Sequence, residues 1–433
     1  MTEHAKRRLL IAVIILSLVP SAVLFGMPNM ASLRSSSLWL SAVVGYMGIV
    51  LLLWMYILGA RGVMSLAFTD LAPVLKIHKW LGKYGTLAIF LHPILITYSY
   101  SASWLYSFIP KVTTQSGRHI LLGQIALWLL ILIWITSALV RSKISWRTWR
   151  YLHWLAYISI PFALLHVPDL GSQITTRPIA RIYFFSLFLA FCMITLLRLR
   201  SMFNLDKAPY EVTYTGQLTT LDSAYILKPS SKEYVAPKRG QYVYVKLGFL
   251  SEDHPFSVAQ YNEMTHEITL AYRKAGMFTK EMQKIKQGQK LYVSGPYGSF
   301  TEDIAPQDLT PIVYIAGGIG ITPFVDRILR ENNQHQQWLF AANRDRSLAV
   351  MYAPLKAVLG DRAIAVYNKQ DGVLEANEEI GFISADLLRK YLGDPTQYRY
   401  YLCGPPPMMN ALHKTLESMG VDKKRVKNEE FGW

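Results

Sequence analysis

The sequence predicts a multi-domain membrane protein: a six-helix transmembrane bundle, then an antiparallel β-barrel domain, then an α/β domain with a parallel sheet. Three observations lead to this fold class. The first 200 residues contain six long apolar runs, the next hundred contain short strand-like runs, and the remainder alternates strands with helices. With 433 residues the chain is long enough for three domains, which we expect at residues 1–200, 206–306 and 307–433.

The six apolar runs are each about as long as a transmembrane helix, which needs about 20 apolar residues. They lie at roughly 9–26, 38–60, 80–103, 119–140, 149–167 and 179–198. The first run follows the basic residues Lys6, Arg7 and Arg8, as in a signal peptide. Its apolar stretch is long and has no clear cleavage site, so we interpret it as a retained span.

The charges of the first 200 residues predict the orientation in the membrane. They comprise 18 Lys and Arg but only three acids, Glu3, Asp70 and Asp169. When the bases are sorted by loop, 13 fall on one side and five on the other, namely Arg34, Lys111, Arg118, Arg177 and Arg181. The positive-inside rule then places both termini in the cytoplasm, as in a multi-pass protein of a plasma (bacterial inner) membrane. The bases flank apolar runs and form no continuous stripe, which argues against a nucleic-acid partner.

Four histidines within these runs form two pairs at matching depths. His78 and His92 lie 14 residues apart on the third run, and His153 and His166 lie 13 apart on the fifth. Neutral imidazole is a good axial ligand for haem iron. We therefore predict that His78 pairs with His153 and His92 with His166, holding two haems roughly 20 Å apart along the helices. The alternative is that the histidines are structural, held by hydrogen bonds.

The spacing of each pair tests this prediction. Fourteen residues of regular helix leave His78 and His92 about 40° apart, on one face, so the third run is expected to be regular. Thirteen residues turn the helix by about 220°, which places His166 near the back. We therefore predict a kink or bulge close to Pro161, which cannot donate a backbone hydrogen bond. Lys79, Lys83 and Arg150 are candidates to meet haem propionates.

The second half changes pattern twice. Runs such as YEVTYTGQL, GQYVYVKLG and EITLAYRK are rich in Val, Tyr and Thr and are separated by Gly or Pro, which favours a small antiparallel barrel. From residue 310, strand and helix patterns alternate, which indicates a parallel sheet covered on both faces. In VYIAGGIGITPF, a strand is followed by Gly317, Gly318 and Gly320 and then a helix, a pattern typical of pyrophosphate binding. The third glycine of a dinucleotide fingerprint is absent.

The order of the motifs carries more information than any one of them. HPFSVA, YRKAGMFT, GPYG, GGIGITP and CGPPPMM follow one another in an arrangement that resembles the ferredoxin–NADP reductase superfamily. Together with six spans and paired histidines, this resembles the NADPH oxidase and ferric reductase transmembrane family. The resemblance implies FAD in the barrel, NADPH (possibly also NADH) on the α/β domain, and two b-type haems in the membrane.

The resemblance also implies site residues. The flavin motif is matched by His254, Pro255, Phe256 and Ser257. Phe256 would pack near the isoalloxazine and Ser257 would hydrogen-bond flavin N5. The flavin pyrophosphate loop is matched by Arg273, Gly276 and Thr279. The NADPH loop is matched by Gly317, Gly318, Gly320 and Thr322, and the loop beside the nicotinamide by Cys403, Gly404 and Pro405.

Two further sites are expected. Arg344 and Arg346 are placed to meet a 2′-phosphate, which would favour NADPH. The chain ends in EEFGW, and members of this superfamily often end in an aromatic residue stacked on the flavin. Trp433 is the candidate for this role and Phe431 the fallback.

The implied activity is transmembrane electron transfer from NADPH through FAD and the haems to an acceptor outside. Oxygen giving superoxide is the expected acceptor, although Ile96 stands where eukaryotic oxidases carry a polar histidine. A ferric chelate is the alternative. A third hypothesis is a flavin reductase on a membrane anchor that serves a protein partner. No calcium-binding loop or proline-rich tail is evident, so no obligatory regulatory subunit is expected.

Overall fold

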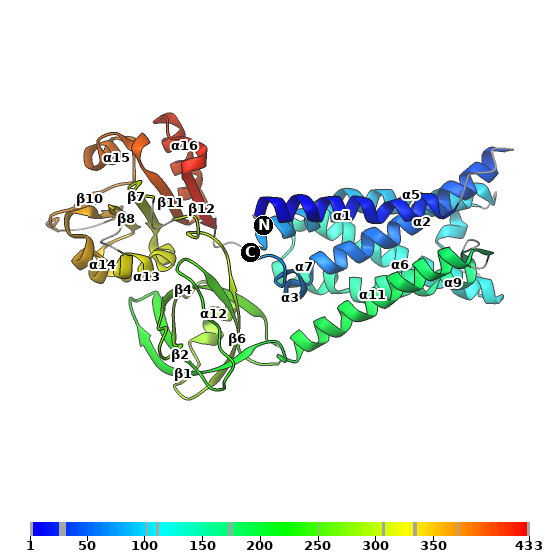
Figure 1. Cartoon of the computed structure of the whole chain (residues 1–433), viewed down its shortest axis with the longest axis horizontal. Coiled ribbons are helices and arrows are strands. Elements are labelled where there is room, and N and C mark those ends of the chain that lie inside the picture. The colour runs from blue at the N-terminus through cyan, green and yellow to red at the C-terminus, as the bar shows by residue number, and fades with distance from the viewer. Residues whose placement is uncertain are drawn as a thin grey trace. The chain divides into compact units, whose positions relative to one another are not determined.

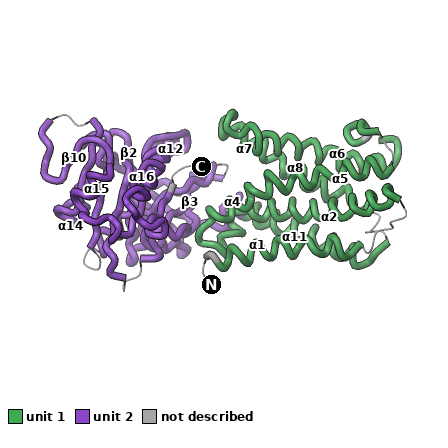
Figure 2. The backbone as a smooth tube through the Cα atoms, turned by 90° about the horizontal axis from the view of Figure 1, so that it is seen from above, with its two compact units in different colours: residues 1–200 green, residues 201–433 purple. Residues whose placement is uncertain are grey.

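The computed structural model of the chain forms two compact units, residues 1–200 and residues 201–433 (Figure 2). The described residues are 3–25, 32–100, 103–109, 112–171, 174, 176–249, 251–304, 308–331, 336–369 and 372–430.

The first unit is helical (Figure 1). Its main helices are α1 (Glu3–Val23), α2 (Leu33–Leu58), α4 (Ala72–Trp80), α5 (Thr86–Ser99), α6 (Gln115–Trp134), α7 (Trp146–Trp154), α8 (Ala156–Leu165) and α11 (Pro178–Met202). Shorter helices are α3 (Arg61–Met64), η2 (Trp104–Ser107), η4 (Arg141–Lys143) and α9 (Val167–Leu170). Within the described part, three helical segments are long and apolar enough to cross a membrane: Leu33–Leu58, Gln115–Leu139 and Pro178–Met202. The prediction of six spans stays a prediction.

Two π-helical turns interrupt the helices of this unit. One, η1 (Leu81–Gly85), joins α4 to α5, and the other, η3 (Ile135–Leu139), continues α6. In η1 the Thr86 N–H bonds the Leu81 carbonyl five residues back, and the Lys83 carbonyl accepts a 2.9 Å bond from the Trp134 indole. The predicted regular helix between His78 and His92 is therefore wrong. A tertiary donor and the wider turn change the helix phase between the two histidines.

The helix that carries His153 and His166 is also interrupted. It is divided at Leu155, between α7 and α8, where the Leu155 N–H bonds the Leu152 carbonyl only three residues back. An irregularity between the two histidines is thus present. It lies six residues before Pro161, which is inside α8, and not beside the proline as predicted.

The second unit begins with the expected antiparallel barrel. Its strands close in the order β1-β2-β5-β4-β3-β6. They are β1 (Ala208–Gln217), β2 (Asp222–Pro229), β3 (Tyr242–Lys246), β4 (Asp253–Tyr261), β5 (Ile268–Arg273) and β6 (Lys290–Tyr297), and α12 (Met277–Met282) precedes β6. Alternate residues of a strand face opposite sides, so Val243 and Val245 fill the interior with Leu270 and Val293.

A six-stranded parallel sheet follows, in the order β10-β9-β8-β7-β11-β12. The strands are β7 (Ile312–Gly317), β8 (Gln337–Asn343), β9 (Ala363–Tyr367), β10 (Glu378–Ile380), β11 (Arg399–Gly404) and β12 (Val426–Glu430). One face packs against α13 (Thr322–Glu331) and α14 (Tyr352–Leu359), the other against α15 (Ala385–Leu392) and α16 (Pro406–Ser418). This confirms the predicted parallel sheet with helices on both faces.

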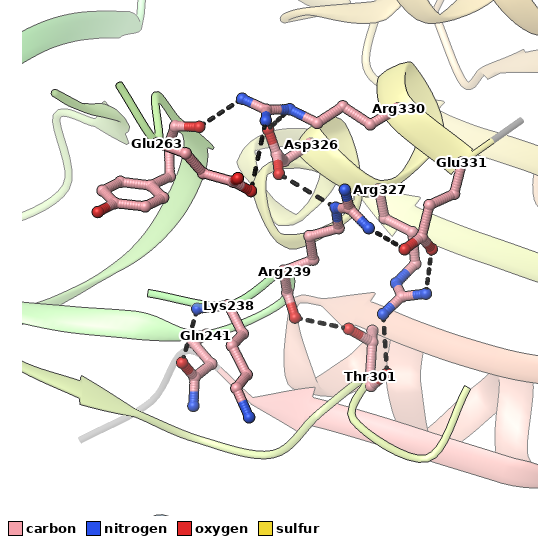
Figure 3. Close-up of polar contacts among 10 residues, drawn as sticks. Lys238, Arg239, Gln241, Glu263, Thr301, Asp326, Arg327, Arg330 and Glu331 are labelled. Atoms are coloured by element: carbon pink, nitrogen blue, oxygen red, sulfur yellow. Dashed lines mark hydrogen bonds and ion pairs between the residues drawn. The ribbon is translucent and has the colours of Figure 1, made fainter. Parts of the chain in front are cut away.

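Charged residues on α13 tie the sheet to the barrel (Figure 3). Glu331 receives hydrogen bonds from Arg239, just before β3, and from Arg327. Arg327 also donates to the Thr301 carbonyl at 3.2 Å, and the Thr301 hydroxyl donates to the Arg239 carbonyl at 2.9 Å. Arg330 pairs with Asp326 at 2.9 Å. Because Asp326, Arg327 and Glu331 are buried, each charge depends on its partners.

We expect Glu331→Gln to lower the free energy of unfolding of this half by about 3 kcal/mol, because two arginines lose their shared carboxylate in a buried site. The measurement is urea unfolding of the purified chain followed by circular dichroism. Glu281→Gln is the matched control, since Glu281 pairs with Lys284 at the surface and such pairs contribute only about 0–1 kcal/mol. Equal effects of the two substitutions would contradict this role of Glu331.

Candidate functional site

All four predicted histidines are held through the same ring nitrogen. The Nδ1 contacts are His78 with the Met55 carbonyl at 3.0 Å, His92 with the Ser41 carbonyl at 2.8 Å, His166 with the Ala163 carbonyl at 2.7 Å, and His153 with the Ser137 hydroxyl at 3.3 Å. A carbonyl oxygen only accepts, so Nδ1 carries the hydrogen in three of the rings. No Nε2 bond to a described residue is seen, which leaves these atoms as lone-pair donors. Metal-ligating histidines are commonly held in this way.

The spacing of the inner pair suits one metal ion between two rings. The centroids of His78 and His153 are 6.1 Å apart and their planes meet at 72°. Two imidazoles that bind one ion from opposite sides with bonds of about 2 Å have centroids about 6 Å apart. At the other level, His166 interacts electrostatically with His92. The described residues include no cluster of three or more His, Cys, Asp or Glu side chains suited to a metal.

Glycines make room for three of the rings. A Cβ on Gly45 of α2 would lie 2.8 Å from His92 Nδ1, and one on Gly123 of α6 would lie 3.2 Å from His166 Cδ2. Gly59, at the end of α2, faces His78 Cε1, which would be 3.5 Å from its Cβ. Gly45 and Gly59 are 14 residues apart, or about 21 Å along a helix. The pattern of α2 therefore matches the two histidine levels, a signal that the sequence analysis missed.

The basic residues near the inner pair include one that was not expected. Lys79 and Lys83 are exposed, and the Arg150 guanidinium lies 4.8 Å from the Trp146 ring and 5.0 Å from the Trp154 ring. Arg198 on α11 interacts electrostatically with both His78 and His153, and Lys79 interacts with His78. In the sequence, Arg198 was indistinguishable from the other bases that flank an apolar run.

Two serine hydroxyls of the barrel are buried without a partner among the described residues. Ser257 on β4 pairs in register with Tyr242, and Ser294 on β6 pairs with Tyr244. Tyr242 and Tyr244 are two residues apart, so all four side chains share the outward face of the barrel. A buried hydroxyl without a hydrogen bond costs free energy. This face therefore suits a polar ligand, and Ser294 is a residue that the sequence analysis missed.

Two other residues of the flavin motif, His254 and Phe256, do not share the outward face that carries Ser257. Phe256 belongs to the barrel core, on the opposite side of β4 from Ser257. Phe256 and Ser257 therefore face opposite sides of the strand, and the expected contact of both with one flavin ring stays a prediction. His254 stacks on Phe278 with centroids 4.7 Å apart, and burial lowers the pKa of His254. Pro255 lies between His254 and Phe256 in the sequence.

Arg273 lies where the barrel meets the glycine loop of the sheet. Its Nε and Nη2 each donate a 2.8 Å bond to the buried carboxylate of Asp222. Its Nη1 would be 2.7 Å from a Cβ on Gly318, which has φ +55°. The Thr279 hydroxyl accepts a 3.0 Å bond from the N–H of Gly276 and so holds the turn before α12. The cation expected for the flavin pyrophosphate therefore borders the predicted nucleotide loop.

The two predicted nucleotide loops touch each other through their glycines. A Cβ on Gly317 would lie 2.7 Å from Pro405 Cδ, and one on Gly404 would lie 3.1 Å from the Gly317 Cα. A Cβ on Gly320 would overlap the Cys403 carbonyl. Thr322, the first residue of α13, donates to the Ile319 carbonyl at 3.0 Å. The backbones can approach this closely only because these positions lack side chains.

The surroundings differ among three predicted site residues, Cys403, Arg344 and Arg346. The Cys403 thiol is buried in the core under α13, and burial raises its pKa, so it stays protonated at neutral pH. Arg346 donates from Nε and Nη2 to both carboxylate oxygens of Glu378, which holds the pKa of Glu378 below its usual range. Arg344 is exposed. Of the two arginines, Arg344 is therefore the better candidate to meet a phosphate.

The predicted flavin lid lies outside the described residues. Trp433 and its fallback Phe431 belong to the last three positions. The described chain ends in β12, whose Glu430 pairs with Gly404 of β11.

Two family descriptions match separate parts of the chain. Residues 44–164 match a ferric reductase-like transmembrane component, and residues 314–414 match an oxidoreductase NAD-binding domain. The first match contains His78, His92 and His153 but ends before His166. The second contains both glycine loops of the sheet.

Curated relatives resemble about half of the chain or less. A flavohemoprotein of Rhodopirellula baltica is 27% identical over 253 residues, 52% of this chain and 60% of the relative. An NADH-cytochrome b5 reductase 1 of Pyricularia oryzae is 32% identical over 159 residues, 35% of this chain and 51% of the relative. The chain thus spans about half to three fifths of the length of these relatives.

Solved structures resemble a similar share. The flavohem-like FAD/NAD-binding domain of a Vibrio cholerae nitric oxide dioxygenase is 20% identical with a TM-score of 0.46, covering 53% of this chain and all of that one. The cytochrome b5 reductase domain of Ulva prolifera nitrate reductase is 21% identical with a TM-score of 0.45, covering 53% of this chain and 98% of that one.

The two family descriptions agree with the arrangement of the chain. A helical unit with long apolar helices precedes an antiparallel barrel and a parallel nucleotide-binding sheet. The chain joins a segment that matches a ferric reductase-like transmembrane component to one that matches an oxidoreductase NAD-binding domain, and in this it resembles oxidoreductases of the ferric reductase type.

Proposed function

We propose that this protein moves electrons across a membrane, from cytoplasmic NADPH through FAD and two b-type haems to oxygen, which leaves as superoxide. The observation that carries this proposal is the arrangement of the four histidines. Each uses Nδ1 for a protein contact, and no Nε2 bond to a described residue competes with a metal. The six transmembrane spans and the domain limits inferred from the sequence are part of the same proposal.

The residues present fit the proposed groups. His78 with His153, and His92 with His166, supply neutral nitrogen ligands, which suit haem iron. The unbonded hydroxyls of Ser257 and Ser294 offer a donor and acceptors on one face of the barrel. Arg273 offers its remaining Nη1 to a pyrophosphate. When bound, FAD would accept a hydride and the haems would carry single electrons.

The chain's own residues would position the dinucleotide and insulate the path of the electrons. Gly317, Gly320 and Gly404 let the two loops of the sheet approach a dinucleotide closely. The 3-10 turn η5 (Gly318–Ile321) leads directly into α13, so the positive end of one helical segment lies at that loop, which favours phosphate. The protonated Cys403 thiol lies in the core and does not act as a nucleophile. One NADPH supplies two electrons, so two oxygen molecules are reduced and one proton is released.

The acceptor decides between the leading proposal and ferric-chelate reduction. The experiment follows NADPH oxidation by purified, FAD-supplemented protein under air and under nitrogen, with haem absorption recorded in parallel. Two results together support oxygen as the acceptor. NADPH oxidation would require air, and superoxide dismutase would abolish the reduction of an added dye. Oxidation under nitrogen that needs added ferric chelate supports the alternative. A chain without haem absorption would overturn both and favour a flavin reductase on a membrane anchor.

We expect His92→Gln to remove the absorption of one haem and leave the other, because one axial nitrogen is lost at one level only. The measurement is the reduced-minus-oxidised spectrum and the haem content per chain. His119→Gln on α6 is the matched control and should retain both haems. Two intact haems in His92→Gln would contradict its assignment as a ligand.

Ser257→Ala should stabilise the barrel without FAD but slow its reaction when FAD is bound. Removing a buried unpaired hydroxyl should raise the stability of FAD-free protein by about 1 kcal/mol. With FAD bound, the same change should slow flavin reduction by NADPH about tenfold through loss of one hydrogen bond. Thermal unfolding and stopped-flow absorbance measure the two effects. A loss of stability without FAD would show that Ser257 already has a protein partner.

Arg344→Ala should raise the KM for NADPH about tenfold and leave that for NADH nearly unchanged, because a charge-assisted hydrogen bond contributes roughly 1.5–3 kcal/mol. Arg346→Ala is the comparison, since its guanidinium is already held by Glu378. Steady-state kinetics with both nucleotides provide the measurement. A larger effect at Arg346 would reverse the assignment.

A further inference from the structure

Arg198, near the end of α11, directs its guanidinium at residues of α2 and α8. Nη1 donates to the Tyr157 hydroxyl and Nη2 to the Tyr56 carbonyl. The guanidinium carbon lies 4.2 Å from the centroid of the Tyr56 ring and 5.3 Å from that of Tyr157. Three helices that are far apart in sequence therefore hold this one cation in place.

The guanidinium also borders the inner histidine pair. A Cβ on Gly59 would lie 3.3 Å from Arg198 Nη2 and 3.5 Å from His78 Cε1, so both groups approach the same glycine. Arg198 interacts electrostatically with His78 and with His153. Whatever lies between these two rings therefore lies beside a fixed positive charge.

The described surroundings of Arg198 contain no carboxylate that neutralises this charge. Its recorded partners, a phenol and a carbonyl, are neutral, and its buried Nε has no partner among the described residues. The first 200 residues contain only three acids, and one of them, Asp70, accepts a bond from the N–H of Ala72 near the start of α4. Arg198 is half-buried, and a buried donor such as its Nε is costly unless an acceptor accompanies it.

We propose that Arg198 binds a carboxylate of the haem held between His78 and His153, and that its charge raises the reduction potential of that haem. This inference rests on the proposed function. A guanidinium binds a carboxylate well because its planar donors match the two oxygens. Reduction adds one negative charge to the haem, and a nearby fixed cation stabilises that state.

The test is a potentiometric titration of the two haems in purified, full-length protein. In Arg198→Gln we expect a shift of one of the two midpoint potentials to lower values, with the other unchanged. Arg200→Gln is the matched control, since Arg200 lies on the same helix and is exposed. Its two potentials should equal those of the unaltered protein. Arg198→Lys keeps the charge and should shift the same potential by less than Arg198→Gln.

The outcomes separate this inference from the proposed function. Unaltered protein without two haem transitions would overturn the proposed function itself. Two normal transitions in the unaltered protein, with unchanged potentials in Arg198→Gln, would overturn the role of Arg198 and leave the proposed function standing. Where Arg198→Gln does not fold, Arg198→Met decides, because it also removes the charge: a fall confined to one midpoint potential supports the inference, and unchanged potentials overturn it.

Discussion

The hydrogen bond at each imidazole Nδ1 is the interaction on which the membrane half depends. An unpaired polar group in an apolar bundle is costly, so a histidine there needs an acceptor. The Met55 and Ser41 carbonyls supply it for His78 and His92, although the Met55 carbonyl also accepts the N–H of Gly59. Because Nδ1 is occupied, Nε2 is the nitrogen that remains as a lone-pair donor. One bond therefore satisfies the ring and selects which nitrogen stays available.

That arrangement explains why glycines and irregular turns gather around the same rings. Gly45 and Gly59 bring α2 close enough for its carbonyls to reach the imidazoles. The π turn at Leu81–Gly85 changes the helix phase between His78 and His92, and the break at Leu155 does so between His153 and His166. π turns often occur at functional sites because they re-aim side chains. Both helices depart from regularity between the residues whose rings must be aimed.

The reductase half uses charge for a different purpose. Asp222 takes two of the donors of Arg273, which fixes the orientation of its guanidinium toward Gly318. The buried network of Arg239, Arg327 and Glu331 holds α13 against the barrel, so the glycine loop at its start stays beside Arg273. Buried ion pairs are weak contributors to stability but constrain geometry. Here they maintain the contact between two predicted phosphate-binding elements.

The sequence by itself determined the class of the two halves and the residue types of the sites. Apolar runs, alternating strands and glycine-rich turns depend on local periodicity, so the barrel, the parallel sheet and the long helices could be predicted. It also predicted that His78 and His153 lie together, and their rings do so in the structure.

Only the tertiary structure decided how those residues are aimed. The π turn depends on an indole from α6, 51 residues away in sequence, which no local pattern contains. The tie of Arg346 to Glu378, the position of Phe256 in the core and the place of Arg198 beside Gly59 likewise depend on partners from other elements. Local sequence sets the period of an element, whereas the direction of a side chain is set by whatever packs against it.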